Sequence, residues 1–343
     1  MVASKLTRLW AARKALAGAA AYWSGFGRIF ARATGARGAI VLMYHSVADD
    51  DDARFIDPAH RMAPSLFERQ MAFLRRRRNV IPYSQLMATI EAGDTPPAGT
   101  VCITFDDGYL DNLHIAAPIL ERLGLPATLF LATGYVARRQ AQWADTLHAD
   151  FQYRSVDRLS MPQLGFDAVD LSNANSRRGA RQALHRCFIE APFDEREAML
   201  AQVAQQLQPL GDRPRTTLGW DEVRELRLRY PSFELGGHTR DHVDLRRHDG
   251  SLGAAEIDGC AHDIERETGE RPRDFSFPYG RWSERSQALV RAAGWRSAVG
   301  AGTAIRIGAQ SDRFAVPRVE APLSMAALRF MTSGAYAGPL RGG

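Results

Sequence analysis

The sequence contains few cysteines, only three among 343 residues. Cys102, Cys187 and Cys260 are odd in number, lie far apart and show no CxxC spacing. This pattern excludes both a disulfide framework and a zinc ribbon. Free thiols are typical of a reducing compartment, so we expect a cytoplasmic protein.

Long hydrophobic runs are also missing. The stretch ALAGAAAYWSGFG at residues 15–27 is apolar, but it is too short and too rich in Ala and Gly to span a bilayer. It is followed by Arg28 and Arg32 and shows no clear small-residue cleavage site, which argues against a signal peptide. No internal repeat or low-complexity tract interrupts the rest of the chain.

Acidic residues are absent from residues 1–38, which we interpret as a basic helical extension. The basic residues there are Lys5, Arg8, Arg13, Lys14, Arg28, Arg32 and Arg37. They contribute +7 to a total of +5, so the remainder of the chain carries −2. Trp10, Trp23, Phe26 and Phe30 lie between them, as in an interfacial helix on anionic lipid. A helix packed on the protein is the alternative.

The overall composition is that of a globular protein with a large core, since 45% of the residues are hydrophobic and 24% are charged. The 39 acidic residues are interleaved with the 44 basic ones, so we expect no nucleic-acid partner. The length fits one barrel with insertions as well as it fits two domains.

Seven short β-rich runs recur along the chain, each followed by a helical pattern such as LDNLHIAAPILERLG. The runs are residues 39–45, 101–105, 127–133, 233–238, 275–279, 296–300 and 314–319. Strands that are apolar on both faces and alternate with helices indicate a parallel sheet covered by helices. We therefore predict an α/β barrel of about seven strands over residues 39–335.

Residues 138–218 interrupt this alternation. The segments SRRGARQALHRCFIEA and DEREAMLAQVAQQLQPL are polar and helical in pattern. We interpret the region as a helical insertion, which can serve as a lid. The run DDDD at residues 49–52 fits a solvated loop better than a metal site.

Polar side chains stand where several predicted strands end. They are His45, Asp106, Asp107, His238 and Tyr279. In α/β barrels the chemistry takes place at the carboxyl ends of the strands. The pattern therefore predicts one site assembled from several strands.

A metal site is the simplest reason for two adjacent carboxylates at the end of a buried strand. His238 and His242 in GGHTRDH are four residues apart, which on a helical turn places both imidazoles on one side. Two surface histidines would show the same spacing, but with Asp107 the set becomes two histidines and one carboxylate, as in catalytic metal sites. The neighbouring Asp106 is then a candidate general base, and Gly108 allows the sharp turn that follows. Zn²⁺ suits these ligands, with Co²⁺ as an alternative.

The motif TFDDGYLDN, followed by GGHTRDH and FSFPYG, resembles the polysaccharide deacetylase family, the nodulation protein B type fold of carbohydrate esterase family 4. The resemblance extends from about residue 40 to residue 329. It implies a distorted (β/α) barrel in which Asp106 is the catalytic base and Asp107, His238 and His242 hold a divalent metal. It also implies a hydrolase that removes N-acetyl groups from N-acetylglucosamine oligomers or polymers. Some relatives deacetylate xylan or act on other amides.

The sequence departs from this family pattern in three places. Ser276 in FSFPYG occupies the position of the usual arginine, and the late Asp-containing and Leu-x-His motifs are absent. Arg318 in AVPRVEA is a candidate to replace the arginine, although a surface role is the alternative. Trp295 in AAGWRSAVG is a candidate wall of the acetyl pocket, with core packing as the alternative. Without the family's arginine, the chain could also be a glycan-binding protein without turnover.

The leaving amine needs a proton donor, and the late histidine of the family is missing. His45 in LMYHSV resembles the N-terminal histidine that takes this role in a subgroup of deacetylases, including biofilm-polysaccharide enzymes; a structural imidazole is the alternative. We expect the metal and a backbone N–H near Tyr279 to bind the oxyanion. Trp220 is either a sugar-stacking residue or a helix anchor. The remaining histidines have no motif around them and are interpreted as surface or helix residues: His60, His114, His148, His185, His248 and His262.

Overall fold

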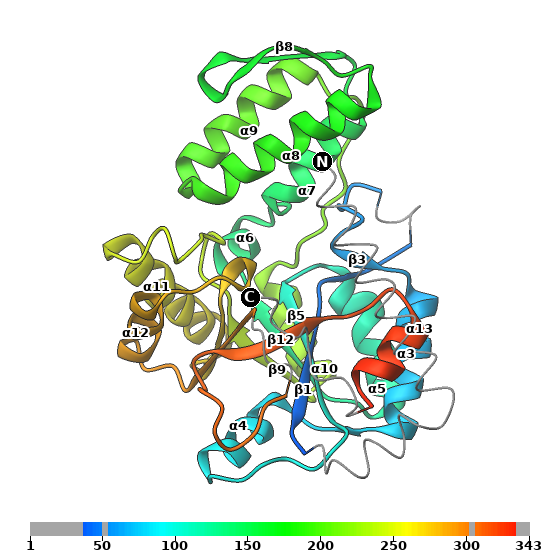
Figure 1. Ribbon diagram of the computed structural model, residues 1–343, viewed down its shortest axis with the longest axis vertical. Coiled ribbons are helices and arrows are strands. Elements are labelled where there is room, and N and C mark those ends of the chain that lie inside the picture. The colour runs from blue at the N-terminus through cyan, green and yellow to red at the C-terminus, as the bar shows by residue number, and fades with distance from the viewer. Residues whose placement is uncertain (1–36, 50–53, 302–305, 334–343) are drawn as a thin grey trace, which may run out of the picture.

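A closed ring of seven parallel strands forms the centre of the protein in this computed structural model, which describes residues 37–49, 54–301 and 306–333 (Figure 1). The strands are β1 (Ala39–Tyr44), β5 (Thr100–Asp107), β6 (Ala127–Leu131), β9 (Phe233–Gly237), β10 (Asp274–Ser276), β11 (Ser297–Ala301) and β12 (Val316–Glu320). They are paired in the order β1, β12, β11, β10, β9, β6, β5, and β5 pairs with β1 to close the ring. The prediction of a seven-stranded α/β barrel is confirmed.

The strands β5 and β6 are buried along their whole length, which explains why their sequences are apolar on both faces. Of the polar residues in β5, Thr104 donates its hydroxyl to the carbonyl oxygen of Leu42 in β1, and Asp106 and Asp107 lie at the carboxyl end of the strand. A short strand, β4 (Asn79–Val80), pairs with the beginning of β5 outside the ring. A parallel pair formed by β2 (Ser46–Val47) and β3 (Arg61–Met62) follows β1 at the carboxyl end of the barrel.

Helices surround the ring, as the right-handed connection of parallel strands requires. They are α3 (Pro64–Arg77), α4 (Tyr83–Glu91), a π-helical turn (Asn112–Ala116) that continues into α5 (Ala117–Leu123), α6 (Thr133–Arg138), α10 (Trp220–Arg229), α11 (Ser251–Thr268), α12 (Glu284–Ala292) and α13 (Met325–Met331). In α3, the buried residues Phe67, Gln70, Met71 and Leu74 repeat with helical spacing and face the core.

Between α6 and α10 the chain forms a second lobe, at the top of Figure 1. It consists of α7 (Trp143–Gln152), the antiparallel strands β7 (Arg158–Met161) and β8 (Phe166–Asp170), α8 (Ala174–Glu190) and α9 (Phe193–Leu207). This lobe has its own hydrophobic core, which includes Trp143, Phe188 and Val203 and extends to Tyr135 of α6. The helical pattern of the sequence did not predict the β7–β8 hairpin.

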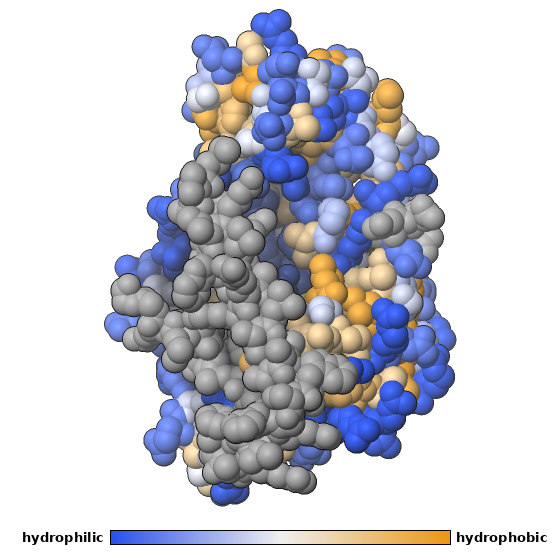
Figure 2. All heavy atoms as spheres, turned by 45° about the vertical axis from the view of Figure 1, so that its right-hand side comes forward, coloured by the Kyte–Doolittle hydropathy of each residue, from blue (hydrophilic) through white to orange (hydrophobic). Residues whose placement is uncertain are grey.

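Most of residues 1–38, for which a basic membrane-binding or packed helix was predicted, lie outside the described part of the chain, as do residues 50–52 of the acidic run. Within the described part, no helix is long and apolar enough to cross a membrane. Outside the grey residues, the face in Figure 2 is largely hydrophilic, with one group of hydrophobic residues near its middle. The large hydrophobic residues exposed in the described part are Leu210, Leu228, Leu252 and Leu323.

Candidate active site

One cavity of about 290 Å³ lies at the carboxyl end of the barrel. Residues at or just after the ends of six strands line it, together with residues of the second lobe. The lining includes His45 after β1, Asp106 and Asp107 of β5, His238 and His242 after β9, Arg318 of β12, and Trp143 and His185 of the second lobe. Strand ends that are distant in the sequence therefore form one site, as barrel geometry dictates.

The turn after β5 aims two neighbouring carboxylates into this cavity. Asp107 has a φ of 76°, a left-handed conformation that Asp tolerates better than most residues, and Gly108 follows with a φ of 86°. A Cβ on Gly108 would lie 3.0 Å from Leu131 and 3.3 Å from Val136. The glycine is required both for the conformation and for the close packing of the turn.

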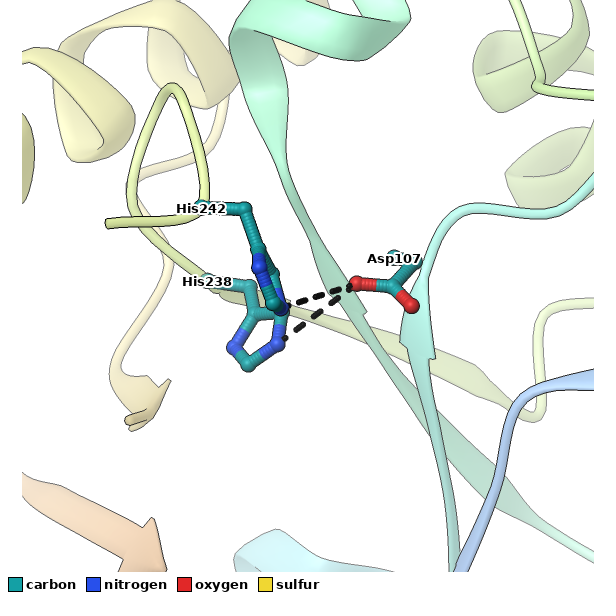
Figure 3. A group of neighbouring side chains, drawn as sticks. All are labelled: Asp107, His238 and His242. Atoms are coloured by element: carbon teal, nitrogen blue, oxygen red, sulfur yellow. Dashed lines mark ion pairs between the residues drawn. The ribbon is translucent and has the colours of Figure 1, made fainter. Parts of the chain in front are cut away.

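Asp107, His238 and His242 point toward one another in Figure 3. Asp107 Oδ1 lies 3.6 Å from His238 Nε2 and 3.4 Å from His242 Nε2. One donor atom from each residue can be chosen so that all three lie within 4.8 Å of one another. Among the described residues this is the one cluster of three His, Cys, Asp or Glu side chains with such a spacing.

The protonation of these residues suits a metal ligand set. The Nδ1 of His238 lies 2.8 Å from the carbonyl oxygen of Ser276, so this nitrogen donates a proton and Nε2 keeps its lone pair toward the cluster. Burial lowers the pKa of His238, and burial followed by the charge of His238 lowers the pKa of His242 well below the usual range. Both imidazoles are therefore neutral, which is the form that binds metals.

The carboxylate of Asp107 also fits a bound cation. Its Oδ1 is buried and has no hydrogen-bond partner. Burial, followed by the charge of Asp106, raises the pKa of Asp107 to about 8. A divalent ion between the three side chains would satisfy the oxygen and reverse this shift. The residues present therefore fit a metal.

Asp106 is held by an arginine from another strand. Arg318 Nη1 donates to Asp106 Oδ1 at 2.6 Å and Nη2 donates to Oδ2 at 2.5 Å, a bidentate pair. Nη2 also donates to Ser276 Oγ at 2.7 Å, and Nη1 donates to Thr104 Oγ1 at 3.2 Å. The Arg318 side chain is only 1% exposed, so the alternative of a surface residue does not hold.

This pair keeps Asp106 ionised. Burial by itself would raise the pKa of the Asp106 carboxyl, but the charge of Arg318 and its hydrogen bonds to the carboxylate outweigh burial and lower the pKa to about 2. Ser276 of FSFPYG takes part in the same network, since its hydroxyl accepts a hydrogen bond from Arg318, a residue 42 positions later in the chain.

A pair of histidines borders the same cavity. The rings of His45 and His60 lie 5.4 Å apart. Burial and the neighbouring His60 lower the pKa of His45 to about 3. Burial also opposes the charged form of His60, but Asp145, with Oδ1 3.7 Å from His60 Nδ1, outweighs it and raises the pKa to about 9. His60 therefore carries a proton at neutral pH while His45 is neutral.

Tyr279 contacts His242 through its side chain. It lies in a 3₁₀ turn (Pro278–Gly280) with a φ of 58°. Its hydroxyl donates to the carbonyl oxygen of His242 at 3.1 Å and accepts a hydrogen bond from Trp143 Nε1 at 2.9 Å. The ring also lies 4.5 Å from that of His242. The side chain therefore does more than pack.

The structure does not bring either of two predicted tryptophans into the cavity. Trp295, predicted as a wall of an acetyl pocket, lies instead in a hydrophobic cluster that joins β10 to α11 and α12, with its ring 5.2 Å from Phe275. A Cβ on Gly237 would lie 2.4 Å from the Trp295 ring, so the indole fills the space that this glycine leaves beneath β9. Trp220 begins α10 and packs against the main core, as the helix-anchor alternative predicted.

Several residues of the cavity were missed by the sequence analysis. His60 and His185, interpreted as surface or helix residues, line the cavity, and Trp143 and Gln142 of the second lobe do so as well. No spacing relates them to the other site residues. The placement of His60 depends on the β2–β3 pairing, and that of the other three depends on the docking of the second lobe.

Comparisons with known proteins agree with this geometry. The sequence profile of the family described as polysaccharide deacetylase matches residues 93–298. YxkH of Bacillus subtilis (strain 168), a protein whose name assigns it to this family, is 34% identical over 94 residues. That match covers 26% of this chain and 30% of YxkH, so it spans less than a third of the relative.

Three solved structures share the fold. The Streptococcus pyogenes deacetylase PplD in complex with acetate has a TM-score of 0.56 at 14% identity, covering 86% of this chain and 97% of that one. IcaB from Ammonifex degensii has a TM-score of 0.56 at 15% identity, covering 87% and 97%. A de-N-acetylase from Aggregatibacter actinomycetemcomitans has a TM-score of 0.53 at 17% identity, covering 85% and 99%. With the profile matching more than half of its residues, this chain belongs to the polysaccharide deacetylase family.

Proposed function

We propose that the protein is a metal-dependent hydrolase that removes N-acetyl groups from an N-acetylglucosamine-containing oligosaccharide or polysaccharide. The observation that carries this proposal is the convergence of Asp107, His238 and His242 beside an ionised Asp106 in one cavity. Membership of the polysaccharide deacetylase family supports it. A divalent ion, Zn²⁺ by preference or Co²⁺, would be held by the three clustered residues and would supply Lewis-acid chemistry for amide hydrolysis.

Asp106 is the proposed general base. Its low pKa means that it is ionised at neutral pH and able to accept a proton. The bidentate contact with Arg318 holds both carboxylate oxygens in one orientation, so that the proton acceptor is positioned before the substrate arrives. Arg318 is in this proposal a positioning residue and takes over the role of the missing arginine in FSFPYG.

His45 is the proposed proton donor to the leaving amine. Its low pKa means that it must receive a proton before it can donate one, and its ring lies 5.4 Å from that of His60 in the same cavity. A backbone N–H at Tyr279 is the proposed donor to the oxyanion, because the turn from Pro278 to Gly280 borders the cavity.

The proposed substrate rests on the family and on the solved relatives, among them a protein described as a de-N-acetylase. We keep the cytoplasmic location, the 39–335 barrel domain with an insertion at 138–218, and the peripheral contact of residues 1–38 with anionic membrane as proposals. Sedimentation with anionic liposomes tests the membrane contact. It compares the full chain with a variant in which the seven lysines and arginines of residues 1–38 are replaced by alanine.

The test of function is acetate release from N-acetylated chitooligosaccharides. Protein stripped of metal and refilled with Zn²⁺ or Co²⁺ should release acetate, and Asp106→Asn should not. If the metal-loaded protein releases no acetate from this substrate but hydrolyses O-acetylated xylan or a non-sugar amide, the proposed substrate class is wrong. If the protein binds glycan tightly and hydrolyses none of these substrates, it is a glycan-binding protein and not an enzyme.

A further inference from the structure

Arg196 is a buried cation in the second lobe whose presence the barrel chemistry does not explain. It lies in α9, is 0% exposed, and has no carboxylate within 4.0 Å among the residues that the structure describes. Its Nε has no hydrogen-bond partner. Burying a guanidinium without a counter-ion is costly, and an aliphatic residue would fill this part of the lobe without that cost.

The donors of Arg196 are directed at the loop that carries the metal ligands. Nη2 donates to the carbonyl oxygen of Asp241 at 2.5 Å, and Nη1 donates to the carbonyl oxygen of His242 at 3.4 Å. Nη2 also lies 3.1 Å from the Tyr135 hydroxyl. The guanidinium thus binds two successive carbonyl groups at the point where the chain turns into His242.

The backbone N–H groups of the same loop are bound by the side chain of Glu256. Glu256 Oε2 accepts hydrogen bonds from the backbone N–H of Arg240 at 2.9 Å and of Asp241 at 2.8 Å. An acceptor oxygen of Glu256 therefore binds the amides, and the positive Arg196 binds the carbonyls. This arrangement holds His242 at a φ of 51°, a conformation that a histidine in a free loop rarely adopts.

A second contact from the same lobe reaches the same carbonyl group. Trp143 Nε1 donates to the Tyr279 hydroxyl, and this hydroxyl donates to the carbonyl oxygen of His242. Trp143 and Arg196 come from different helices, α7 and α9, and lie close together, with the guanidinium 5.8 Å from the indole ring. The second lobe thus reaches the backbone of one metal ligand by two routes.

We propose that Arg196 is a positioning residue for the metal site, holding the Asp241 and His242 carbonyl groups so that the His242 imidazole faces Asp107 and His238. The inference rests on the proposed function because it assumes that these three residues bind a metal. It makes the second lobe a part of the metal site, in addition to any role as a cover over the substrate.

The test compares Arg196→Met, which removes all the donors, with Arg196→Lys, which keeps the charge. Val203→Ala is the control, because Val203 is a fully buried residue of the same helix that belongs to the core of the second lobe. For each protein we would measure the Zn²⁺ dissociation constant by competition with a chromophoric chelator, the visible spectrum of bound Co²⁺, and the metal-free melting temperature.

We expect Arg196→Met to raise the Zn²⁺ dissociation constant about 10–100-fold, the usual effect of losing support behind a metal ligand, and to change the Co²⁺ spectrum. Arg196→Lys should recover part of the affinity. Val203→Ala should lower the melting temperature and leave both metal readouts unchanged. Unchanged affinity and spectrum in a folded Arg196→Met protein would overturn the inference and leave Arg196 a structural residue of the lobe.

If Arg196→Met does not fold, Tyr279→Phe tests the same coupling, because it removes the other donor to the His242 carbonyl group. A changed Co²⁺ spectrum in this variant together with a Zn²⁺ affinity of Arg196→Lys below that of the wild type would support the inference, and native spectra in both would overturn it. The proposed function fails separately: wild-type protein that binds no metal through Asp107, judged against Asp107→Ala, would remove the metal site itself.

Discussion

Replacing Arg318 by methionine is the most direct test of the buried ion pair between Arg318 and Asp106, the proposed general base. The change removes a guanidinium that makes two hydrogen bonds to Asp106 and one each to Ser276 and Thr104. Both members of the pair are almost fully buried, with side chains 1% and 3% exposed. Breaking a buried pair by removing one partner costs about 3–5 kcal/mol, because the remaining charge is left without compensation.

We therefore expect Arg318→Met to lower the free energy of unfolding by about 3–5 kcal/mol at pH 7. The assay is urea unfolding followed by tryptophan fluorescence, in chelator so that metal binding does not add to the stability. The matched control is Arg313→Met, which precedes the same strand and loses an exposed pair with Glu91. Such exposed pairs contribute only about 0–1 kcal/mol.

The double variant separates charge from packing. If the penalty comes from an uncompensated Asp106 carboxylate, then Asp106→Asn combined with Arg318→Met should be more stable than Arg318→Met alone. Turnover of Arg318→Met should fall about 10²-fold or more, as for other losses of general-base function. A loss of stability below 1 kcal/mol, or no recovery in the double variant, would refute this account of the site.

Further predictions concern the metal and the packing of Trp295 against β9. Asp107→Ala should lose bound metal and activity together, whereas Asp106→Asn should keep the metal and lose turnover; metal analysis beside acetate release checks both, and turnover by Asp106→Asn would contradict the base assignment. Gly237→Ala should lower the free energy of unfolding by about 1–3 kcal/mol, because the new Cβ would lie 2.4 Å from the Trp295 ring. Gly250→Ala, at a position with open space, is the control for thermal unfolding.

Strand pattern and strand-end residues were readable from the sequence because they depend on local order. The seven β-rich runs correspond to the seven strands of the ring, with ends that differ by at most three residues. The parallel arrangement then brings the carboxyl ends of those strands together, which is why Asp106, Asp107, His238 and His242 meet. The candidate metal cluster was predicted from the motifs and the expected barrel, but residues 238–242 form a loop, with His242 at a φ of 51°, and not the helical turn that the spacing argument assumed.

Other features depended on which strands and lobes become neighbours, and no local pattern encodes this. From the sequence, Arg318 could be either a surface residue or a partner of Asp106. The closed ring places it beside Asp106, because β12 pairs with β1 and β1 pairs with β5. Trp295 was a candidate wall of the cavity, but its ring lies in the hydrophobic core, in the space beside Gly237. His60 and Arg196 have no motif, and their proximity to the site results from the β2–β3 pair and the docked second lobe. The sequence alone determined the strands and the ligand types, whereas tertiary packing decided which charges support them, since those contacts join segments up to 212 residues apart.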